Sequence, residues 1–198
     1  MASLTLKGKS EARAFSLNRI KSILAESPKK GLDIQVSESL NGLLDELNPG
    51  QINSGFIACY QALSHEPEVV LSLSKNLCFP KVNSNQGLDY YVAQNSTPTW
   101  LKSSWGVLEP DISSTDWKLV SPEKMAMVLI PALGFTDQGF RLGHGKGCYD
   151  RFLPDLPENT LKVGVGYSVS VTPQDWVEED HDIKLDFIVT DKFVIKVF

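Results

Sequence analysis

The chain has 198 residues, of which 42% are hydrophobic, so it can bury one substantial core, or one domain with a small appendage. Its 24 acidic residues outnumber its 19 basic residues, and a formal net charge of −5 argues against a protein that binds nucleic acid along a broad basic surface. No apolar run approaches the roughly 18 residues that a membrane-spanning helix needs. We therefore expect neither nucleic acid nor a membrane as a partner.

Three cysteines, Cys59, Cys78 and Cys148, are widely spaced along the chain. An odd number, without a C-x-x-C pair or a zinc-type cluster with histidine, indicates a reducing compartment rather than a disulfide framework. The N-terminal residues carry no apolar secretory core. We therefore expect a cytoplasmic protein. The same residues are rich in Ser, Lys and Arg and poor in acids, so a mitochondrial presequence is the alternative.

Two helices are predicted in the first quarter of the chain. Residues 7–26 have apolar side chains at helical spacing, and Pro28 with Gly31 marks the expected end of that helix. A second apolar stripe predicts a helix over Val36–Leu47, with Ser37 as its N-cap. Both stripes are wide enough to pack against a sheet.

Apolar or alternating runs predict the strands of that sheet. They cover Phe56–Tyr60, Asn76–Pro80, Gly87–Gln94, Met125–Leu133, Leu161–Tyr167 and the residues that follow Asp186. A helix is expected over Val69–Leu77, which gives the strand–helix–strand order of a parallel sheet. Another helix is expected to begin at Arg151, and the polar segment Asp111–Glu123 is expected to be a loop.

Alternate glycines follow the strand predicted at Met125–Leu133. Glycine loses the most backbone freedom on folding, so such a cluster weakens any regular element. It suits a loop that closely approaches a ligand, where backbone N–H groups can bind an anion. Arg141, Lys146 and His144 can add positive charge, and Asp150 offers the hard carboxylate oxygen that Mg²⁺ accepts beside a phosphate. The glycines are Gly143, Gly145 and Gly147.

The alternative is a structural loop that is merely rich in glycine. The segment is not a Walker A loop, because five residues rather than four separate Gly139 from the Gly145-Lys146 pair, and Gly147 stands where Ser or Thr belongs. It is not the dinucleotide-binding fingerprint either, since the third glycine comes one residue too early.

The whole segment resembles the signature of the 5-formyltetrahydrofolate cyclo-ligase family, also called methenyltetrahydrofolate synthetase. That family has a hydrophobic strand ending in Pro-Gly-Leu-Gly/Ala-Phe-Asp, followed by Gly-x-Arg-Leu-Gly-x-Gly-x-Gly-Tyr-Tyr-Asp. Here the two parts read Pro131-Ala-Leu-Gly-Phe-Thr136 and Gly139-Phe-Arg-Leu-Gly-His-Gly-Lys-Gly-Cys-Tyr-Asp150. Ala132 replaces a glycine, Thr136 an aspartate, and Cys148 the first of two tyrosines.

The resemblance implies a single three-layer α/β domain, in which helices flank a mostly parallel central sheet, with a small β-hairpin or mixed-sheet extension. It implies ATP- and Mg²⁺-dependent cyclisation of 5-formyltetrahydrofolate to 5,10-methenyltetrahydrofolate, with release of ADP and phosphate. ATP would be a co-substrate, Mg²⁺ the metal, and the second substrate a reduced folate with or without a polyglutamate tail. A monomer is expected.

The resemblance also implies a nucleotide site. Lys9-Ser-Glu-Ala-Arg13 matches the family's Lys-x-x-x-Arg on the first helix, which helps to hold the ATP phosphates; a solvated basic face is the alternative. Arg141, Lys146 and Tyr149 are the expected catalytic residues, and Asp150 and Asp182 the expected Mg²⁺ ligands. The expected ATP-binding residues are Lys9, Arg13, Arg141, Leu142, Gly143, His144, Gly145, Lys146, Gly147, Cys148 and Tyr149.

The folate site follows from the same resemblance. Glu66 comes after the predicted strand Phe56–Tyr60, as a folate-contacting glutamate does in the family; a surface acid is the alternative. Trp105 opens Trp-Gly-Val-Leu-Glu-Pro, which matches an aromatic-Gly-Ile-x-Glu-Pro segment of the family, and its ring would lie against the pterin or pack in the core. The expected substrate-binding residues are Gln61, Glu66, Trp105, His144, Gly145, Lys146, Gly147 and Cys148.

Two other functions are consistent with these residues. One is a folate- or nucleotide-binding regulator on the same fold that lacks the ring-closing activity. The other is an ATP-dependent ligase or kinase that acts on another small molecule, and Cys148 in place of a tyrosine bears on this alternative because it changes the pocket wall.

Overall fold

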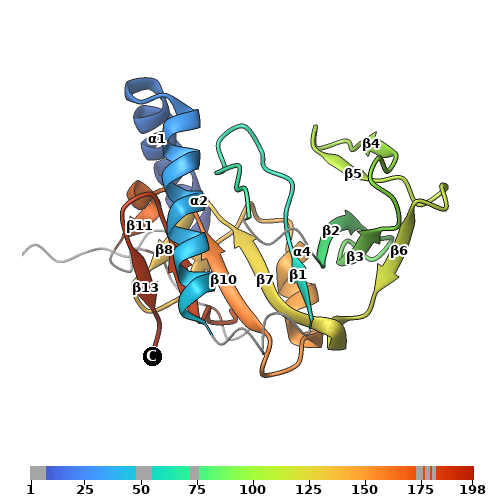
Figure 1. Cartoon of the computed structure of the whole chain (residues 1–198). Helices are drawn as coiled ribbons and strands as arrows, with labels where there is room; N and C mark the ends of the chain where they lie inside the picture. Colours follow the sequence, from blue (N-terminus) through green and yellow to red (C-terminus); the bar gives the residue numbers. More distant parts are fainter. Residues whose placement is uncertain (1–7, 48–54, 72–75, 173–175, 177–178, 180–181) are drawn as a thin grey trace, which may run out of the picture.

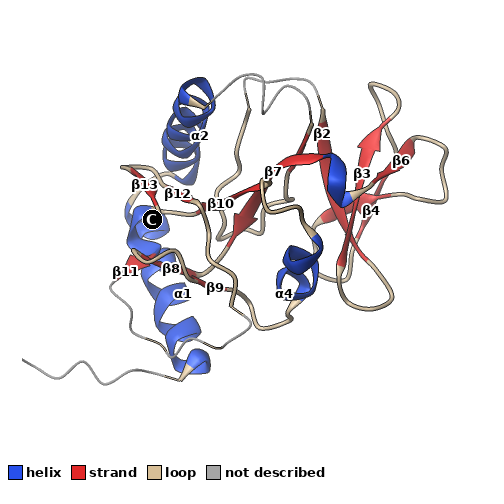
Figure 2. Ribbon diagram, turned by 90° about the horizontal axis from the view of Figure 1, so that it is seen from below, coloured by secondary structure: helices blue, strands red, loops and turns tan. Residues whose placement is uncertain are grey.

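Two long helices begin the chain in the computed structural model, which describes residues 8–47, 55–71, 76–172, 176, 179 and 182–198. The helices are α1 (Lys9–Glu26) and α2 (Lys29–Glu46), and both lie toward the end of the central sheet that carries β13 (Figures 1 and 2). A short helix, α4 (Cys148–Phe152), follows the glycine-rich segment. Three single 3₁₀ turns cover Pro122–Lys124, Leu153–Asp155 and Ser168–Ser170.

The strands are short, and most are three to seven residues long. They are β1 (Phe56–Ala58), β2 (Leu77–Val82), β3 (Leu88–Ala93), β4 (Trp100–Lys102), β5 (Leu108–Pro110), β6 (Trp117–Val120), β7 (Met125–Pro131), β8 (Gly134–Thr136), β9 (Arg141–Leu142), β10 (Leu161–Val165), β11 (Val171–Thr172), β12 (Phe187–Val189) and β13 (Val194–Lys196).

Eight of these strands form the central sheet, in the order β13-β12-β10-β7-β1-β2-β3-β6. The five strands from β12 to β2 run parallel, whereas β13, β3 and β6 are antiparallel to their neighbours. A three-stranded sheet, β11-β8-β9, and the β4–β5 hairpin complete the fold. The expected α/β class, the mostly parallel sheet and the small extension are all confirmed.

The core lies on both faces of the sheet, because successive residues of β7 point to opposite sides. Met127 and Leu129 pack in the cluster that includes Ile20 of α1 and Val36 of α2. The alternating residues of β7 pack in a second cluster with Phe152 of α4. Figure 2 shows α2 and α4 on opposite sides of the sheet. Burial on both faces explains why the central strands are continuous apolar runs.

The site is positioned by the carboxyl ends of two adjacent parallel strands, β1 and β7. In such sheets, ligands bind beyond this edge. After β7 the chain forms the β8–β9 hairpin, and it returns through residues 143–147 directly into α4. The segment after β1 leads to Glu66 at the same edge. Residues far apart in the sequence therefore meet there.

The prediction of the second helix was wrong at its start. Gly31 does not end the first helix but lies inside α2, since α1 ends at Glu26 and α2 begins at Lys29. Burial of Leu32 on the apolar face of α2 outweighs the cost of glycine in the first turn. Ser37 is not a cap: its hydroxyl donates to the carbonyl of Asp33, and it accepts a hydrogen bond from the backbone of Val70.

Three further segments differ from the predictions. Val69–Leu71 has no regular structure and Leu77 begins β2, so the helix expected there is wrong at both ends; residues 72–75 lie outside the described part of the chain. The expected loop Asp111–Glu123 contains β6, which is fixed by antiparallel pairing with β3. The helix expected from Arg151 begins earlier, at Cys148, and has only five residues.

The cysteines and the helices bear on two further expectations from the sequence. All three cysteines are free thiols, as expected, and burial raises the pKa of Cys59 to about 12. Within the described residues, no helix combines the length and the apolar character that crossing a membrane requires.

Two glycine-to-alanine substitutions test the packing of this fold. A Cβ added at Gly164 of β10 would lie 2.6 Å from atoms of Phe135 and Leu185, so Gly164→Ala is expected to lower the free energy of unfolding by about 1–3 kcal/mol. A Cβ at the exposed Gly42 of α2 meets nothing within 4 Å, so Gly42→Ala is expected to raise it by about 0.5–1 kcal/mol. Urea titration measures both, and equal stabilities would contradict the described packing.

Candidate active site

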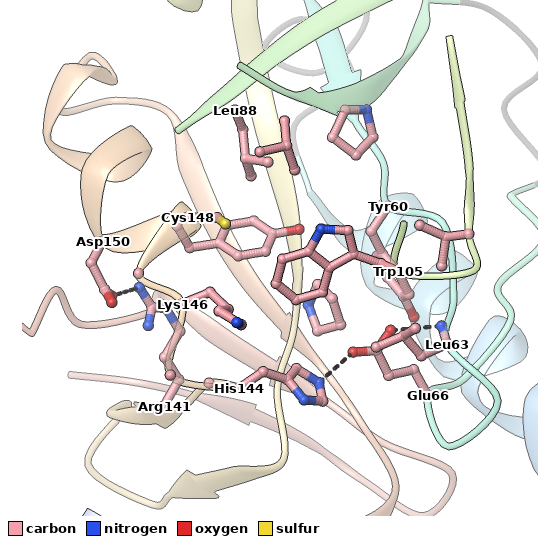
Figure 3. A pocket seen from close by; sticks show the side chains of 18 of the residues that line it. Tyr60, Leu63, Glu66, Leu88, Trp105, Arg141, His144, Lys146, Cys148 and Asp150 are labelled. Atoms are coloured by element: carbon pink, nitrogen blue, oxygen red, sulfur yellow. Dashed lines mark hydrogen bonds and ion pairs between the residues drawn. The ribbon is translucent and has the colours of Figure 1, made fainter. Parts of the chain in front are cut away.

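One pocket collects all the residues that the sequence predicted for the site. They come from α1, from the segment after β1, from the β4–β5 hairpin, from the chain between β9 and α4 including both elements, and from the segment before β12. Figure 3 shows members of the middle three groups, among them Glu66, Trp105 and Lys146. The predicted residues that line it are Lys9, Arg13, Gln61, Glu66, Trp105, Arg141, Leu142, Gly143, His144, Gly145, Lys146, Gly147, Cys148, Tyr149, Asp150 and Asp182.

The glycine-rich loop has a backbone that favours glycine at two of its three positions. Gly145 has φ 85° and Gly147 has φ 69°, in the left-handed region where a side chain is strained, whereas Gly143 does not. Between Gly143 and Gly147, no backbone N–H donates a hydrogen bond to another described residue. These groups can therefore serve a ligand. The five-residue α4 that follows adds only a small dipole.

Helix α1 is fastened to this loop. Arg13 donates a hydrogen bond of 2.9 Å from Nε to the carbonyl oxygen of Gly143. A Cβ on Gly145 would lie only 3.1 Å from Cζ of Arg13, so the absence of a side chain there lets the guanidinium lie directly against the loop. The expected convergence of the first helix and the glycine loop is thus present in the fold.

Lys9 is an ion-pair centre and not part of a solvated basic face, so that alternative was wrong. Its Nζ lies 2.9 Å from both Oδ2 of Asp182 and Oε2 of Glu179, and its side chain is 18% exposed. Burial alone would lower the pKa of Lys9, but its hydrogen bonds to Asp182 and Glu179 raise it overall. The predicted phosphate-binding lysine and the predicted metal-binding aspartate are therefore direct neighbours.

Arg141 and Asp150 form a second pair across the loop. The guanidinium of Arg141 is buried, and its Nη2 donates to Oδ1 of Asp150 (Figure 3). Its Nε is also buried and has no hydrogen-bond partner within the described residues. A buried donor without a partner costs free energy, so a ligand oxygen at this point would be stabilised.

Lys146 is the cation of the loop that stays available. It makes no ion pair with another described residue, and its Nζ lies 5.3 Å from the ring centre of Trp105. Trp105 is 40% exposed on the connection between β4 and β5, so the alternative of core packing was wrong for this side chain. The indole and the ammonium face the pocket together (Figure 3).

Glu66 is buried rather than a surface acid, so that alternative was wrong as well. It is 4% exposed, and its Oε2 accepts a hydrogen bond of 2.9 Å from the N–H of Leu63. Its Oε1 lies 3.0 Å from Nε2 of His144. A second imidazole, that of His65, lies 3.4 Å from the same nitrogen, and burial lowers the pKa of His65.

Sequence reasoning missed the apolar wall of the pocket. Most of its members lie on or beside β2, β3 and β5, where alternation in the sequence marks one sheet face without showing what packs against that face. Tyr60 and Leu63 follow β1, and Pro131 ends β7. The missed residues are Tyr60, Leu63, Pro80, Val82, Leu88, Val107, Leu108, Glu109 and Pro131. His65 was missed too, because a lone histidine in a loop gives no signal.

Comparison with known proteins adds to this geometry. A model of the 5-formyltetrahydrofolate cyclo-ligase family matches residues 7–191. The chain belongs to that family. Among curated relatives, a probable 5-formyltetrahydrofolate cyclo-ligase of Schizosaccharomyces pombe is 28% identical over 140 residues, which are 65% of this chain and 68% of that protein. The 5-formyltetrahydrofolate cyclo-ligase of Mycoplasma pneumoniae is 38% identical over 71 residues, which are 36% of this chain and 42% of that protein.

Solved structures of the family share the fold along nearly the whole chain. The 5,10-methenyltetrahydrofolate synthetase of Aquifex aeolicus matches with a TM-score of 0.71 and 29% identity, over 96% of this chain and 92% of its own. That of Mycoplasma pneumoniae matches with a TM-score of 0.68 and 26% identity, over 94% of this chain and 100% of its own. The sequence resemblance to this family is confirmed; the roles of individual side chains stay predictions.

Removing the carboxylate at position 150 tests the Arg141 pair. Asp150→Asn leaves the buried guanidinium without a charged partner, so we expect the free energy of unfolding to fall by about 1–3 kcal/mol. Asp155→Asn, at an exposed acid just beyond α4, should change it by less than about 0.5 kcal/mol. Chemical denaturation measures both. If the two variants lose the same amount of stability, the pair does not hold the loop.

Proposed function

We propose that this pocket carries out the ATP- and Mg²⁺-dependent cyclisation of 5-formyltetrahydrofolate to 5,10-methenyltetrahydrofolate, with release of ADP and phosphate. The cyclo-ligase activity itself follows from membership of the family. One observation supports the location above all others: a glycine loop whose backbone N–H groups donate to no other described residue is lined by cations from the first helix and from the loop itself.

The nucleotide end of the pocket is proposed to lie at this loop. Lys9, Arg13, Arg141 and Lys146 line the pocket around it, and their positive charge complements the negative charge of a triphosphate. The loop's N–H groups add hydrogen-bond donors that require no side chain. Lys146 is proposed to stabilise the transferring phosphoryl group, because its ammonium has no ion pair to give up among the described residues.

The folate end is proposed to lie on the apolar wall. Trp105 offers an exposed aromatic face on which a pterin ring can lie, and Leu88 and Leu108 offer further apolar surface. Glu66, held in place by the N–H of Leu63, can accept hydrogen bonds from the pterin, with Gln61 beside it. A polar group fixed within an apolar cavity is what gives a ligand site its orientation.

The residues present fit Mg²⁺. Asp150 and Asp182 both line the pocket and offer hard oxygen ligands, and Mg²⁺ is usually held by one or two carboxylates together with substrate phosphates. When bound, the ion would neutralise phosphate charge. Both carboxylates are paired with cations, Asp150 with Arg141 and Asp182 with Lys9. We propose that the incoming phosphates take over these cations and release the carboxylates.

The chemistry proposed from the family requires no protein nucleophile. The formyl oxygen of the folate attacks the γ-phosphorus and displaces ADP, and N10 then attacks the activated carbon, so that the ring closes and phosphate leaves. The protein's part is to position the reactants and to stabilise charge on the transferring group. Tyr149 stays protonated at neutral pH, because burial raises the pKa of its phenol, and it can donate a hydrogen bond.

All the residues proposed for the pocket come from a single chain, which can therefore form the site by itself. We therefore propose that the enzyme acts as a monomer. We propose that the second substrate is a reduced folate, with or without a polyglutamate tail.

Lys146→Ala tests the proposed role of the loop cation. We expect turnover to fall by about 10²–10³-fold, because a positioned donor to developing charge is removed, while stability changes by less than about 0.5 kcal/mol. Lys30→Ala, at an exposed position of α2, is the matched control and should keep full turnover. The rise of methenyl absorbance with ATP, Mg²⁺ and 5-formyltetrahydrofolate is the measurement. Unchanged turnover of Lys146→Ala would refute the role, and ATP binding without any methenyl product in wild type would favour a regulator.

Trp105→Ala tests the proposed folate contact. Loss of the indole face should raise KM for the folate by about tenfold or more, in keeping with the roughly 1–3 kcal/mol expected for a stacked ring. Trp105→Phe keeps an aromatic face and should lie between Trp105→Ala and wild type. Steady-state kinetics with the folate varied at saturating ATP separates the variants. A KM that rises for ATP but not for the folate would place Trp105 at the nucleotide end.

A further inference from the structure

A group of three side chains at the folate end of the pocket has no assigned role as a unit. His65, Glu66 and His144 come from two loops that are almost 80 residues apart in sequence, and one ligand atom from each lies within 4.8 Å of the others. Nε2 of His65 and Nε2 of His144 are 3.4 Å apart, and Nε2 of His144 is 3.0 Å from Oε1 of Glu66.

Hydrogen bonds alone do not satisfy the three ligand atoms at the same time. A neutral imidazole nitrogen carries either a proton or a lone pair, so Nε2 of His144 can form a good hydrogen bond with only one of its two neighbours. A cation, in contrast, accepts a lone pair from all three atoms at once. A Zn²⁺ ion bound at about 2.0–2.1 Å in tetrahedral geometry holds its ligand atoms about 3.3 Å apart, close to the two distances that Nε2 of His144 makes with Nε2 of His65 and Oε1 of Glu66.

The surroundings also suit a metal site. Glu66 is buried, and the N–H of Leu63 holds its other oxygen, which fixes the carboxylate as a neighbouring hydrogen bond does for a metal ligand. The side chain of His144 is 31% exposed, so an ion has a path from solvent and a water can fill the fourth position.

We propose that His65, Glu66 and His144 bind a Zn²⁺-class transition metal with two imidazoles and one carboxylate. This donor set suits Zn²⁺ and its neighbours, whereas Mg²⁺ takes oxygen ligands such as those of Asp150 and Asp182. Two of the three ligands, Glu66 and His144, line the pocket. On the proposed function, a bound metal therefore withdraws Glu66 from the folate, and Zn²⁺ inhibits the enzyme competitively with that substrate.

Metal binding is tested without substrates. Metal-stripped protein is titrated with Zn²⁺ in a calorimeter and with Co²⁺ by visible absorption, and we expect one ion per chain, micromolar affinity or tighter, and the intense bands of four-coordinate cobalt. Mg²⁺ should not compete. His65→Gln and Glu66→Gln should each weaken Zn²⁺ binding by about tenfold or more. Cys148→Ser controls for the thiol in the same pocket and should bind as wild type. Absent Zn²⁺ binding, or binding that His65→Gln leaves intact, overturns the site.

Inhibition is tested with His65→Gln, because His65 has no proposed role in catalysis or in substrate binding. Its basal turnover should equal that of wild type, and about tenfold more free Zn²⁺ should be needed to inhibit it. Chelation of ATP by zinc affects both proteins equally, so the difference between them reports the site. A wild type that binds Zn²⁺ but keeps full turnover refutes the link to the folate. If no methenyl product forms even without zinc, the proposed function fails while the titrations still decide the metal site.

Discussion

The site depends on the contact between α1 and the glycine loop. Arg13 reaches the carbonyl of Gly143 across 130 residues of sequence, and it lies so close to Gly145 that a methyl group there would meet its guanidinium at 3.1 Å. Arg13 and Gly143 both line the pocket, as do Trp105 and Leu108 of the β4–β5 hairpin. Without the contact with α1, the loop would have backbone donors and Lys146 but would lack the cations of the first helix. The backbone donors of the loop and the cations of α1 therefore share one pocket only because these two distant segments pack together.

Two cations of the pocket, Lys9 and Arg141, form ion pairs with acidic side chains. Lys9 is held by Asp182 and Glu179, and Arg141 by Asp150, so the cations are already positioned and their desolvation is partly compensated. A triphosphate that arrives with a divalent cation can exchange partners with these pairs, since phosphate oxygens take the lysine and the arginine while the metal takes the carboxylates. On this proposal Lys9, Arg141, Asp150 and Asp182 would all find new partners, which favours a phosphate ligand that carries its own metal over one that does not.

Sequence reasoning succeeded where local chemistry decides the structure. The strand Met125–Pro131 is apolar on both faces, and Gly145 and Gly147 have the positive φ that glycine allows, so both the central strand and the loop could be predicted. It failed where tertiary contacts override local preference. Gly31 is helical because the face of α2 beside it is buried, and β6 is a strand because β3 pairs with it. The long-range placement of Lys9 beside Asp182 came from the family resemblance, since no spacing rule links residues so far apart.

The buried carboxylate of Glu66 suits two different ligands, a pterin N–H group and a metal ion. Its exclusion from water and its hydrogen bond from Leu63 make it a fixed acceptor, which suits a pterin N–H group. The same rigidity suits a metal, because Nε2 of His144 already lies 3.0 Å from Oε1 of Glu66 and 3.4 Å from Nε2 of His65. A folate and a Zn²⁺ ion would compete for the same oxygen. The proposed folate contact accounts for Glu66, but it does not account for the second imidazole. Substitutions of His65 therefore separate the proposed metal site from the proposed folate contact.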